Sequence, residues 1–169
     1  MRLRLVLRSL GRNFNLVSYG IWEDMVKSYP LESSLTGKTV VDVGCDYGNS
    51  PLYWRARGAA KIIGYEKNPS FQRRLRYSLM KYPWFEFRGV WNGEMPEGDV
   101  FKMDCEGCES NLKLEELSRY GTWFVAIHDL PKLDVDTIWL GPRLEALGGK
   151  IVNAHPLNRE VSYKGGRVP

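Results

Sequence analysis

The chain has 169 residues, of which 43% are hydrophobic and 26% charged, and its formal net charge is +4. These values are typical of one globular domain and exclude a chain that is disordered throughout. Apolar runs stay well below the about 18 residues of a membrane-spanning helix, and arginines interrupt the first apolar run, which argues against a secretory signal. Three cysteines do not indicate a disulfide-rich secreted scaffold, so we expect a cytoplasmic protein without a membrane partner.

Hydrophobic periodicity predicts short strands that alternate with amphipathic helices. In chain order these are a helix over 16–30, a strand over 38–43, a helix over 49–58, a strand over 60–66, a helix over 68–82, strands over 84–90 and 99–105, a helix over 108–121, a strand over 122–129, a helix over 133–149, and strands over 150–156 and 159–166. Ser50 and Gly58 are the expected caps of one helix, and Asn68 or Ser70 caps the next. Pro142 predicts a kink or break in the last helix.

This alternation predicts an α/β protein with a single-domain, Rossmann-like, doubly wound sheet. We expect the sheet to be mostly parallel, with an antiparallel C-terminal hairpin strand. The span 90–99 is too short for a full helix, so one helix of such a fold should be missing. Residues 1–36 are expected to be a basic N-terminal segment and helix packed on the domain, which itself spans 37–169. In such sheets ligands bind at the carboxyl ends of the strands.

Basic residues gather at the start, in "MRLRLVLR" and "LGR", and again in "FQRRLRYSLMK". Either solvated surfaces or a surface for a phosphate-bearing partner explains these clusters. RNA is therefore kept as an alternative partner beside a small-molecule substrate, and the oligomeric state is not predicted.

The segment "VVDVGCDYGNS" places four polar or glycine residues at the end of the first predicted strand, with the spacing D-x-G-x-D-x-G: Asp42, Gly44, Asp46 and Gly48. The glycines permit a tight turn and close approach of a ligand. The segment does not fit G-x-G-x-x-G, and its negative charge suits a cationic ligand, such as an ammonium or sulfonium, better than a pyrophosphate. An ordinary strand followed by a glycine turn is the alternative.

Acidic residues also end two later strands. Glu66 stands about twenty residues after the glycine loop, where nucleotide-binding α/β domains place a carboxylate for ribose hydroxyls. In "FKMDCEGCES", Asp104, Glu106 and Glu109 crowd one strand end, where their mutual repulsion must be offset. Acids at the start of a helix explain Glu109 well and Asp104 poorly.

These segments, with the later "FVAIH", occur in the order and spacing of class I S-adenosylmethionine-dependent methyltransferases. The D-x-E-G-x-E element resembles the FkbM family, and the resemblance covers about residues 38–129. It implies S-adenosylmethionine as cofactor and methylation of a small-molecule or sugar-type hydroxyl. The cofactor-binding residues that it implies are Asp42, Gly44, Asp46, Gly48, Glu66, Trp91, Asn92, Asp104 and Glu106. An RNA methyltransferase and a non-catalytic protein that retains the fold are the alternatives.

Two features concern the chemistry of this implied site. His128, at the end of the fifth strand, has an ordinary pKa near neutrality and is the expected catalytic base, with Asp104 as the alternative. A single C-x-x-C is a weak zinc signal, and we predict no metal.

Cys45 and Asp46 stand where the family usually has Ala-Asn. A disulfide between Cys45 and Cys105 is left open, because both follow neighbouring strands.

Overall fold

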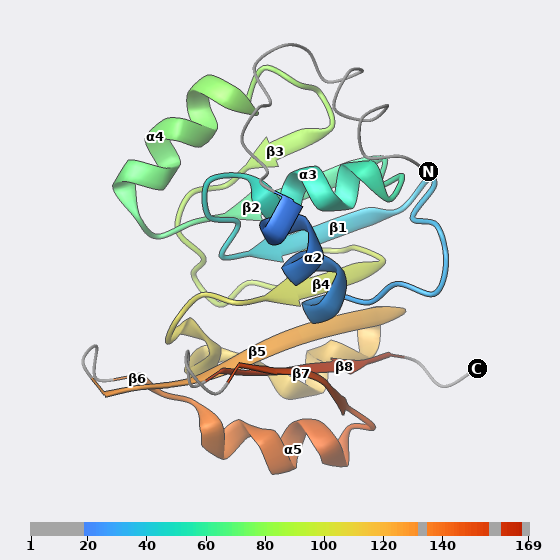
Figure 1. Ribbon diagram of the computed structural model, residues 1–169, viewed down its shortest axis with the longest axis vertical. Coiled ribbons are helices and arrows are strands. Elements are labelled where there is room, and N and C mark those ends of the chain that lie inside the picture. The colour runs from blue at the N-terminus through green and yellow to red at the C-terminus, as the bar shows by residue number, and fades with distance from the viewer. Residues whose placement is uncertain (1–18, 132–134, 156–159, 167–169) are drawn as a thin grey trace.

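The computed structural model describes residues 19–131, 135–155 and 160–166 and shows a central sheet with helices on both faces (Figure 1). The strand order is β3-β2-β1-β4-β5-β8-β7, and β6 pairs with β5 off this path. The strands are β1 (Thr39–Val43), β2 (Lys61–Tyr65), β3 (Phe85–Phe87), β4 (Val100–Met103), β5 (Thr122–Leu130), β6 (Val135–Asp136), β7 (Lys150–His155) and β8 (Glu160–Gly165).

The five strands from β3 to β5 are parallel to their neighbours, and β8 is antiparallel to both β5 and β7. The predicted fold class, with its antiparallel C-terminal hairpin strand, is therefore confirmed. The first strand, β1, lies in the middle of the sheet. From β1 the chain runs outward through β2 and β3, and it returns to β4 on the other side of β1. The carboxyl ends of β1 and β4 thus form the topological switch point, where ligands bind in sheets of this kind.

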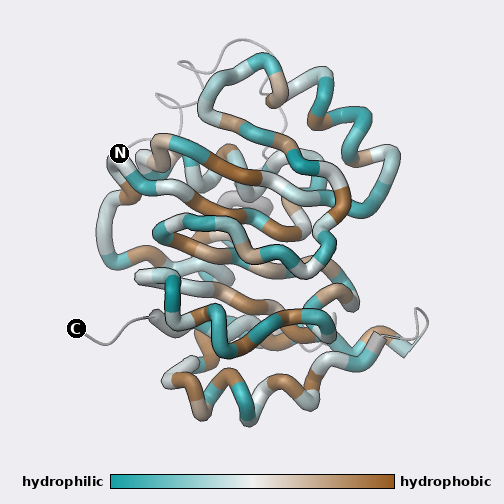
Figure 2. The backbone as a smooth tube through the Cα atoms, turned by 180° about the vertical axis from the view of Figure 1, so that it is seen from behind, coloured by the Kyte–Doolittle hydropathy of each residue, from teal (hydrophilic) through white to brown (hydrophobic). Residues whose placement is uncertain are grey.

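Two hydrophobic clusters fill the space on the two faces of the sheet. On one face, α2 (Tyr19–Ser28), α3 (Asn49–Ala56) and α4 (Pro69–Ser78) surround a core that contains Val40, Trp54, Leu75 and Phe124. On the other face, a core with Phe101 lies beneath the 3-10 helices η1 (Cys108–Asn111) and η2 (Leu114–Arg119) and the helix α5 (Gly141–Ala146). Apolar stretches accordingly follow the central strands (Figure 2).

The loop between β3 and β4 contains no helix, as its length predicted. Trp91 and Met95 of this loop are buried in the same cluster as Ile63 of β2. The loop therefore covers part of the sheet face that a helix would otherwise cover.

Three local predictions were wrong. Residues 108–121 form η1 and η2 and no α-helix, because the extended backbone of Leu112 separates them and the side chain of Glu109 turns inward. Ser50 lies within α3, whose N-cap is Gly48. The segment before Pro142 forms β6 and the short 3-10 helix η4 (Ile138–Leu140) in place of the predicted helix. The break predicted at Pro142 is confirmed, because α5 begins at Gly141 and holds Pro142 in its first turn, where its fixed φ fits. Residues 133 and 134 of the predicted helix lie outside the described residues.

Asn68 caps α4 as predicted, since its side chain accepts a hydrogen bond from the Ser70 amide. Half of the predicted N-terminal unit 1–36, namely residues 1–18, lies outside the described residues. Tyr29 and Leu35, which follow α2, are buried in the core of the α2 face. Among the described residues, no helix is long and apolar enough to cross a membrane.

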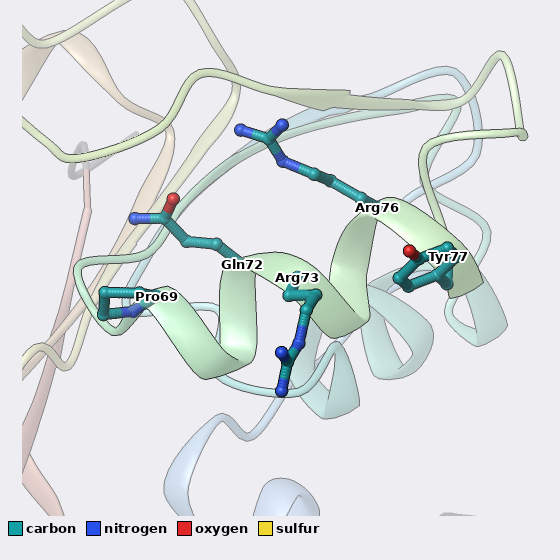
Figure 3. A pocket seen from close by; sticks show the side chains of 5 residues that line it. All are labelled: Pro69, Gln72, Arg73, Arg76 and Tyr77. Atoms are coloured by element: carbon teal, nitrogen blue, oxygen red, sulfur yellow. The ribbon is translucent and has the colours of Figure 1, made fainter.

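Two surface pockets lie away from the switch point. One, of about 490 Å³, lies along α4 and is lined by Pro69, Gln72, Arg73, Arg76 and Tyr77 (Figure 3). The other, of about 720 Å³, lies at the amino ends of the parallel strands, beside Thr39, Lys61 and Tyr120.

Candidate functional site

The loop after β1 turns sharply at the switch point. Gly44 and Asp46 both have positive φ, of 78° and 49°, and a Cβ atom on Gly44 would overlap the backbone carbonyl oxygen of Asp104. Only glycine therefore fits at position 44, where the loop packs against the end of β4. Asp46 adopts the left-handed conformation that Asn and Asp tolerate best among non-glycine residues, so aspartate suits this position of the turn.

Cys45, the other departure from that pattern, points away from the ligand side. Its side chain is fully buried in the core of the α2 face, and burial raises the pKa of its thiol well above the usual value. Cys45 thus fills a core position.

Glu66 ties the carboxyl end of β2 to this loop. Its Oε2 accepts a hydrogen bond of 2.9 Å from the Asp46 amide, and its Oε1 accepts one of 2.7 Å from the Asn68 amide. A carboxylate can accept about four hydrogen bonds, so Glu66 retains lone pairs for about two more. The predicted residues Asp46 and Glu66 are therefore in direct contact.

Beneath the loop lies a buried lysine that the sequence analysis missed. Lys102 Nζ is 3.2 Å from Asp42 Oδ1 and donates a hydrogen bond of 2.6 Å to the Gly44 carbonyl. Trp54 donates to the other oxygen of Asp42. Asp42 is fully buried and faces Lys102, so its carboxylate supports the glycine loop from below and does not line a ligand surface. A lysine inside the apolar strand "VFKM" was the available signal.

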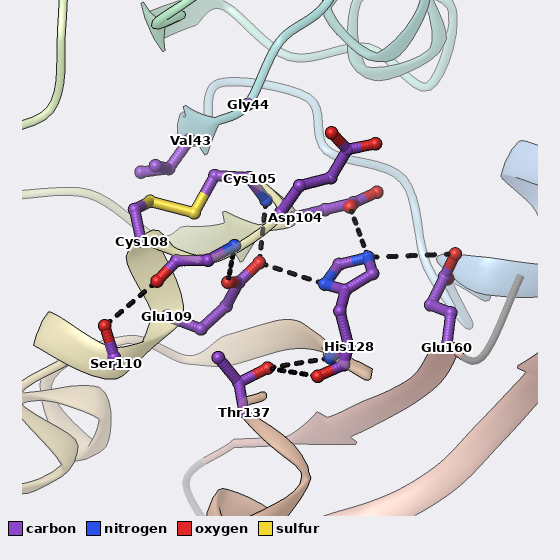
Figure 4. Close-up of polar contacts among 12 residues, drawn as sticks. Val43, Gly44, Asp104, Cys105, Cys108, Glu109, Ser110, His128, Thr137 and Glu160 are labelled. Atoms are coloured by element: carbon purple, nitrogen blue, oxygen red, sulfur yellow. Dashed lines mark hydrogen bonds and ion pairs between the residues drawn. A yellow bond between two sulfur atoms is a disulfide. The ribbon is translucent and has the colours of Figure 1, made fainter. Parts of the chain in front are cut away.

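His128 joins two of the predicted carboxylates of the "DCEGCE" segment (Figure 4). Its Nε2 lies 3.4 Å from Asp104 Oδ1, and its Nδ1 lies 3.3 Å from Glu109 Oε1. Tyr29 donates a hydrogen bond of 2.7 Å to the second oxygen of Asp104, and Glu160 lies 4.0 Å from His128 Nε2. The predicted residues Asp104 and His128 thus lie together, and Glu109 completes their cluster.

The contacts between His128 and the two carboxylates determine which of these side chains are ionised. Burial alone would lower the pKa of His128, but the hydrogen bonds and charges of Asp104 and Glu109 outweigh burial and raise that pKa to about 10. Burial opposes ionisation of Asp104, yet Lys102 and His128 hold the pKa of Asp104 well below its usual range. An imidazolium carries no free lone pair, so His128 in this state cannot act as the predicted base.

The same three side chains are the group among the described residues whose atoms lie close enough to hold a metal ion, all within 4.8 Å of one another. However, Asp104 and Glu109 approach different nitrogens of the His128 ring. A metal on one ring nitrogen would need one carboxylate to move across the ring. The imidazolium already supplies the positive charge that two buried carboxylates require.

Glu109 also organises the turn after β4. Its two oxygens accept hydrogen bonds of 2.8 and 2.6 Å from the amides of Cys105 and Gly107. Cys105 and Cys108 form a disulfide, and Cys45 is free, so the pairing of Cys45 with Cys105 is not formed. Glu106 has φ of +52° and is exposed at the tip of this turn.

In the loop after β3, only part of the predicted cofactor-binding set is exposed. The indole of Trp91 is buried, and its N–H donates a hydrogen bond of 2.6 Å to the Glu94 carbonyl. Trp91 therefore packs in the core and does not present its ring to a ligand. Its neighbours Val90 and Asn92 are exposed, so a ligand could reach their side chains.

These charged side chains carry excess negative charge: the carboxylates of Asp42, Asp104 and Glu109 outnumber the cations of Lys102 and His128, which leaves a net charge of −1 for these five groups. Glu66 adds a further carboxylate. An acidic edge with hydrogen-bond acceptors at the end of β2 fits a cofactor that carries a sulfonium, an ammonium and ribose hydroxyls.

The fold is that of class I S-adenosylmethionine-dependent methyltransferases. The C-terminal domain of precorrin-6Y C5,15-methyltransferase from Rhodobacter capsulatus superposes with a TM-score of 0.62 at 12% identity over 95% of both chains. Fibrillarin from Aeropyrum pernix, solved with bound S-adenosyl-L-methionine, gives 0.59 at 15% identity over 83% of this chain and 71% of its own. Fibrillarin from Methanococcus jannaschii, a pre-rRNA processing protein, also gives 0.59 at 17% identity, over 84% of this chain and 71% of its own.

Two virus proteins are similar to the chain in sequence. Uncharacterized protein 65 of Sulfolobus islandicus filamentous virus (isolate Iceland/Hveragerdi) is 37% identical over 131 residues, which cover 76% of this chain and 82% of that protein. Uncharacterized protein 158B of Sulfolobus islandicus rod-shaped virus 1 is 35% identical over 113 residues, 64% of this chain and 71% of its own. No family model matches the sequence. The chain belongs to the family of these Sulfolobus virus proteins.

Proposed function

We propose that this protein binds S-adenosylmethionine and transfers its methyl group to a hydroxyl oxygen of a small molecule or sugar. The observation that carries the proposal is the position of Glu66, which is fixed by the Asp46 and Asn68 amides at the switch point and retains free lone pairs. The resemblance of the D-x-E-G-x-E segment to the FkbM family supports an oxygen acceptor.

When bound, the cofactor supplies a methyl group on a positively charged sulfur. Glu66 accepts hydrogen bonds from ribose hydroxyls, and the acidic cluster around Asp104 offsets the positive charge. Asp104 is the carboxylate of this cluster with a partly exposed side chain. It would accept a hydrogen bond from the acceptor hydroxyl and orient it, while His128 keeps Asp104 ionised. As the hydroxyl oxygen takes the methyl group and the carbon–sulfur bond breaks, the hydroxyl proton would pass to solvent water at the exposed side of Asp104.

Calorimetric titration with S-adenosylmethionine and with its demethylated product tests cofactor binding. We expect both to bind the wild type, and we expect Glu66→Ala to weaken binding at least tenfold. Glu94→Ala is the control, because Glu94 is exposed in the β3–β4 loop. Urea unfolding shows whether each variant remains folded. Absence of binding at about 1 mM cofactor, which corresponds to about −4 kcal/mol, contradicts the proposal.

A non-catalytic binding protein is the second candidate, because His128 and Asp104 neutralise each other and neither is a strong base. Transfer of a labelled methyl group to a panel of hydroxyl acceptors separates the two. Cofactor binding without transfer to sugar, small-molecule or RNA acceptors favours the non-catalytic candidate.

A further inference from the structure

The helix α4 carries an unusually basic surface. Between residues 67 and 83 the chain has five cations and no Asp or Glu, and the cations are Lys67, Arg73, Arg74, Arg76 and Lys81. Cations elsewhere, such as Lys61, Lys113 and Lys164, form ion pairs with carboxylates. In the part of the chain that the structure describes, no carboxylate forms an ion pair with Arg73, Arg76 or Lys81. The positive charge of α4 is therefore available to a partner.

The surface pocket of about 490 Å³ lies on this helix, and its lining residues recur at intervals of three and four, which places them on adjoining parts of one helical surface. The side chains of Arg73 and Arg76 project from successive turns (Figure 3). Next to them the ring of Tyr77 is 80% exposed. Water surrounds most of this aromatic ring, which has no role in the core.

The opposite side of α4 packs against the core of the domain. Leu75 and Leu79 are fully buried against α3 and the sheet. At the start of the helix, the Gln72 amide donates a hydrogen bond of 2.8 Å to the Glu66 carbonyl. The basic surface is thus anchored to the carboxyl end of β2, and a chain bound along α4 would extend toward the switch point.

We propose that α4 binds single-stranded nucleic acid, with Arg73 and Arg76 on backbone phosphates and a base stacked on Tyr77. Phosphates are the anions that unpaired arginines recognise best, because the guanidinium binds two oxygens at once. An exposed ring beside them favours a single strand, since a duplex keeps its base faces stacked inside. This binding goes beyond methyl transfer and does not depend on it.

Fluorescence anisotropy with a labelled short oligouridylate and its DNA counterpart tests the proposal in the absence of cofactor. We expect binding to fall at least tenfold in Arg73→Glu/Arg76→Glu. The matched control is Arg143→Glu/Lys150→Glu, which makes the same charge change on exposed residues of α5 and β7 at the other end of the sheet. The control should bind within about twofold of wild type.

Two further readouts separate phosphate contact from stacking. Two lost phosphate contacts lower the slope of log affinity against log salt by about 1.4. Tyr77→Ala should weaken binding about tenfold without changing this slope, and Tyr77→Phe should restore it. Equal losses in the α4 and control variants, or binding of phosphatidylserine vesicles in place of either oligonucleotide, overturn the proposal.

Discussion

Lys102 Nζ lies 3.2 Å from Asp42 Oδ1, and the two side chains are 2% and 0% exposed. The pair joins β4 to β1, and the hydrogen bond from Lys102 to the Gly44 carbonyl extends it to the glycine loop. Burial alone would lower the pKa of Lys102, but Asp42 and Asp104 raise it, so the ammonium stays charged. The shape of the candidate cofactor loop therefore depends on a charge pair below it.

Lys102→Met should lower the free energy of unfolding by about 3–5 kcal/mol, because it leaves the carboxylate of Asp42 buried without a cation to balance its charge. Urea unfolding measures this change. Asp42→Asn/Lys102→Met should recover most of the loss, since the double variant removes both charges. Lys113→Met is the control: its ion pair with Glu116 is exposed and should contribute less than about 1 kcal/mol. Equal effects of the two single variants would contradict the structural role of Lys102.

The ring of His128 should remain protonated through neutral pH. Asp104, Glu109 and Glu160 are ionisable groups that face it, and against the lowering effect of burial Asp104 and Glu109 raise its pKa to about 10. In His155→Gln, which leaves a single histidine signal, the Cε1 proton chemical shift measured by NMR should stay constant between about pH 6 and 8. A midpoint near 6.5 would show that the ring is not held between the carboxylates.

The same pair of carboxylates makes stability depend on pH. A pKa that is raised in the folded protein adds stability that is complete below the ordinary value of 6.5 and is lost as the pH rises through about 10. At about 1.4 kcal/mol per pKa unit, the contribution of His128 is at most about 5 kcal/mol. The difference in unfolding free energy between wild type and His128→Gln should therefore shrink from pH 6 to pH 10. A constant difference over this range would exclude the contribution.

The disulfide between Cys105 and Cys108 closes the turn that holds Glu109. Denaturation without reductant and reaction with iodoacetamide should modify Cys45 alone, which intact mass reports. Reduction should lower the free energy of unfolding by about 2 kcal/mol, as expected for a loop of this length. Cys105→Ser/Cys108→Ser should be insensitive to reductant. Modification of all three cysteines before reduction would exclude the bond.

The fold could be predicted because its signals are local. Valine-rich runs such as 39–43 are buried strands whatever surrounds them, and Pro142 cannot continue a helix from the preceding residues. The prediction of an α-helix over 108–121 was wrong because the leucine spacing of this segment also fits an α-helix. There, the disulfide and the inward turn of Glu109 outweigh periodicity, and both depend on contacts that form only in the fold.

The candidate site could be predicted only in part. Strand ends indicated Glu66, Asp104 and His128, because parallel strands bring their carboxyl ends together. Which groups neutralise one another depends on side-chain direction. The positions of Lys102 beneath the loop and of Glu109 beside His128 follow from the register of β4 and the turn after it.

Trp91 provides the last test, since the family resemblance implied that it binds the cofactor and the structure places it in the core. Trp91→Ala should lower the free energy of unfolding by about 3–5 kcal/mol, as expected for loss of a buried aromatic side chain. Trp91→Phe keeps a core ring but loses the hydrogen bond to the Glu94 carbonyl, so a loss of about 1 kcal/mol is expected. Urea unfolding measures both.

The control for Trp91 is its neighbour Val90, which is 59% exposed. Val90→Ala should leave stability within about 0.5 kcal/mol of wild type. In calorimetry with S-adenosylmethionine, Trp91→Phe should bind within about twofold of wild type, because the indole faces the core. If Trp91→Phe instead lost cofactor affinity while keeping its stability, the indole would have to reach the ligand, and the β3–β4 loop would have to rearrange when the cofactor binds.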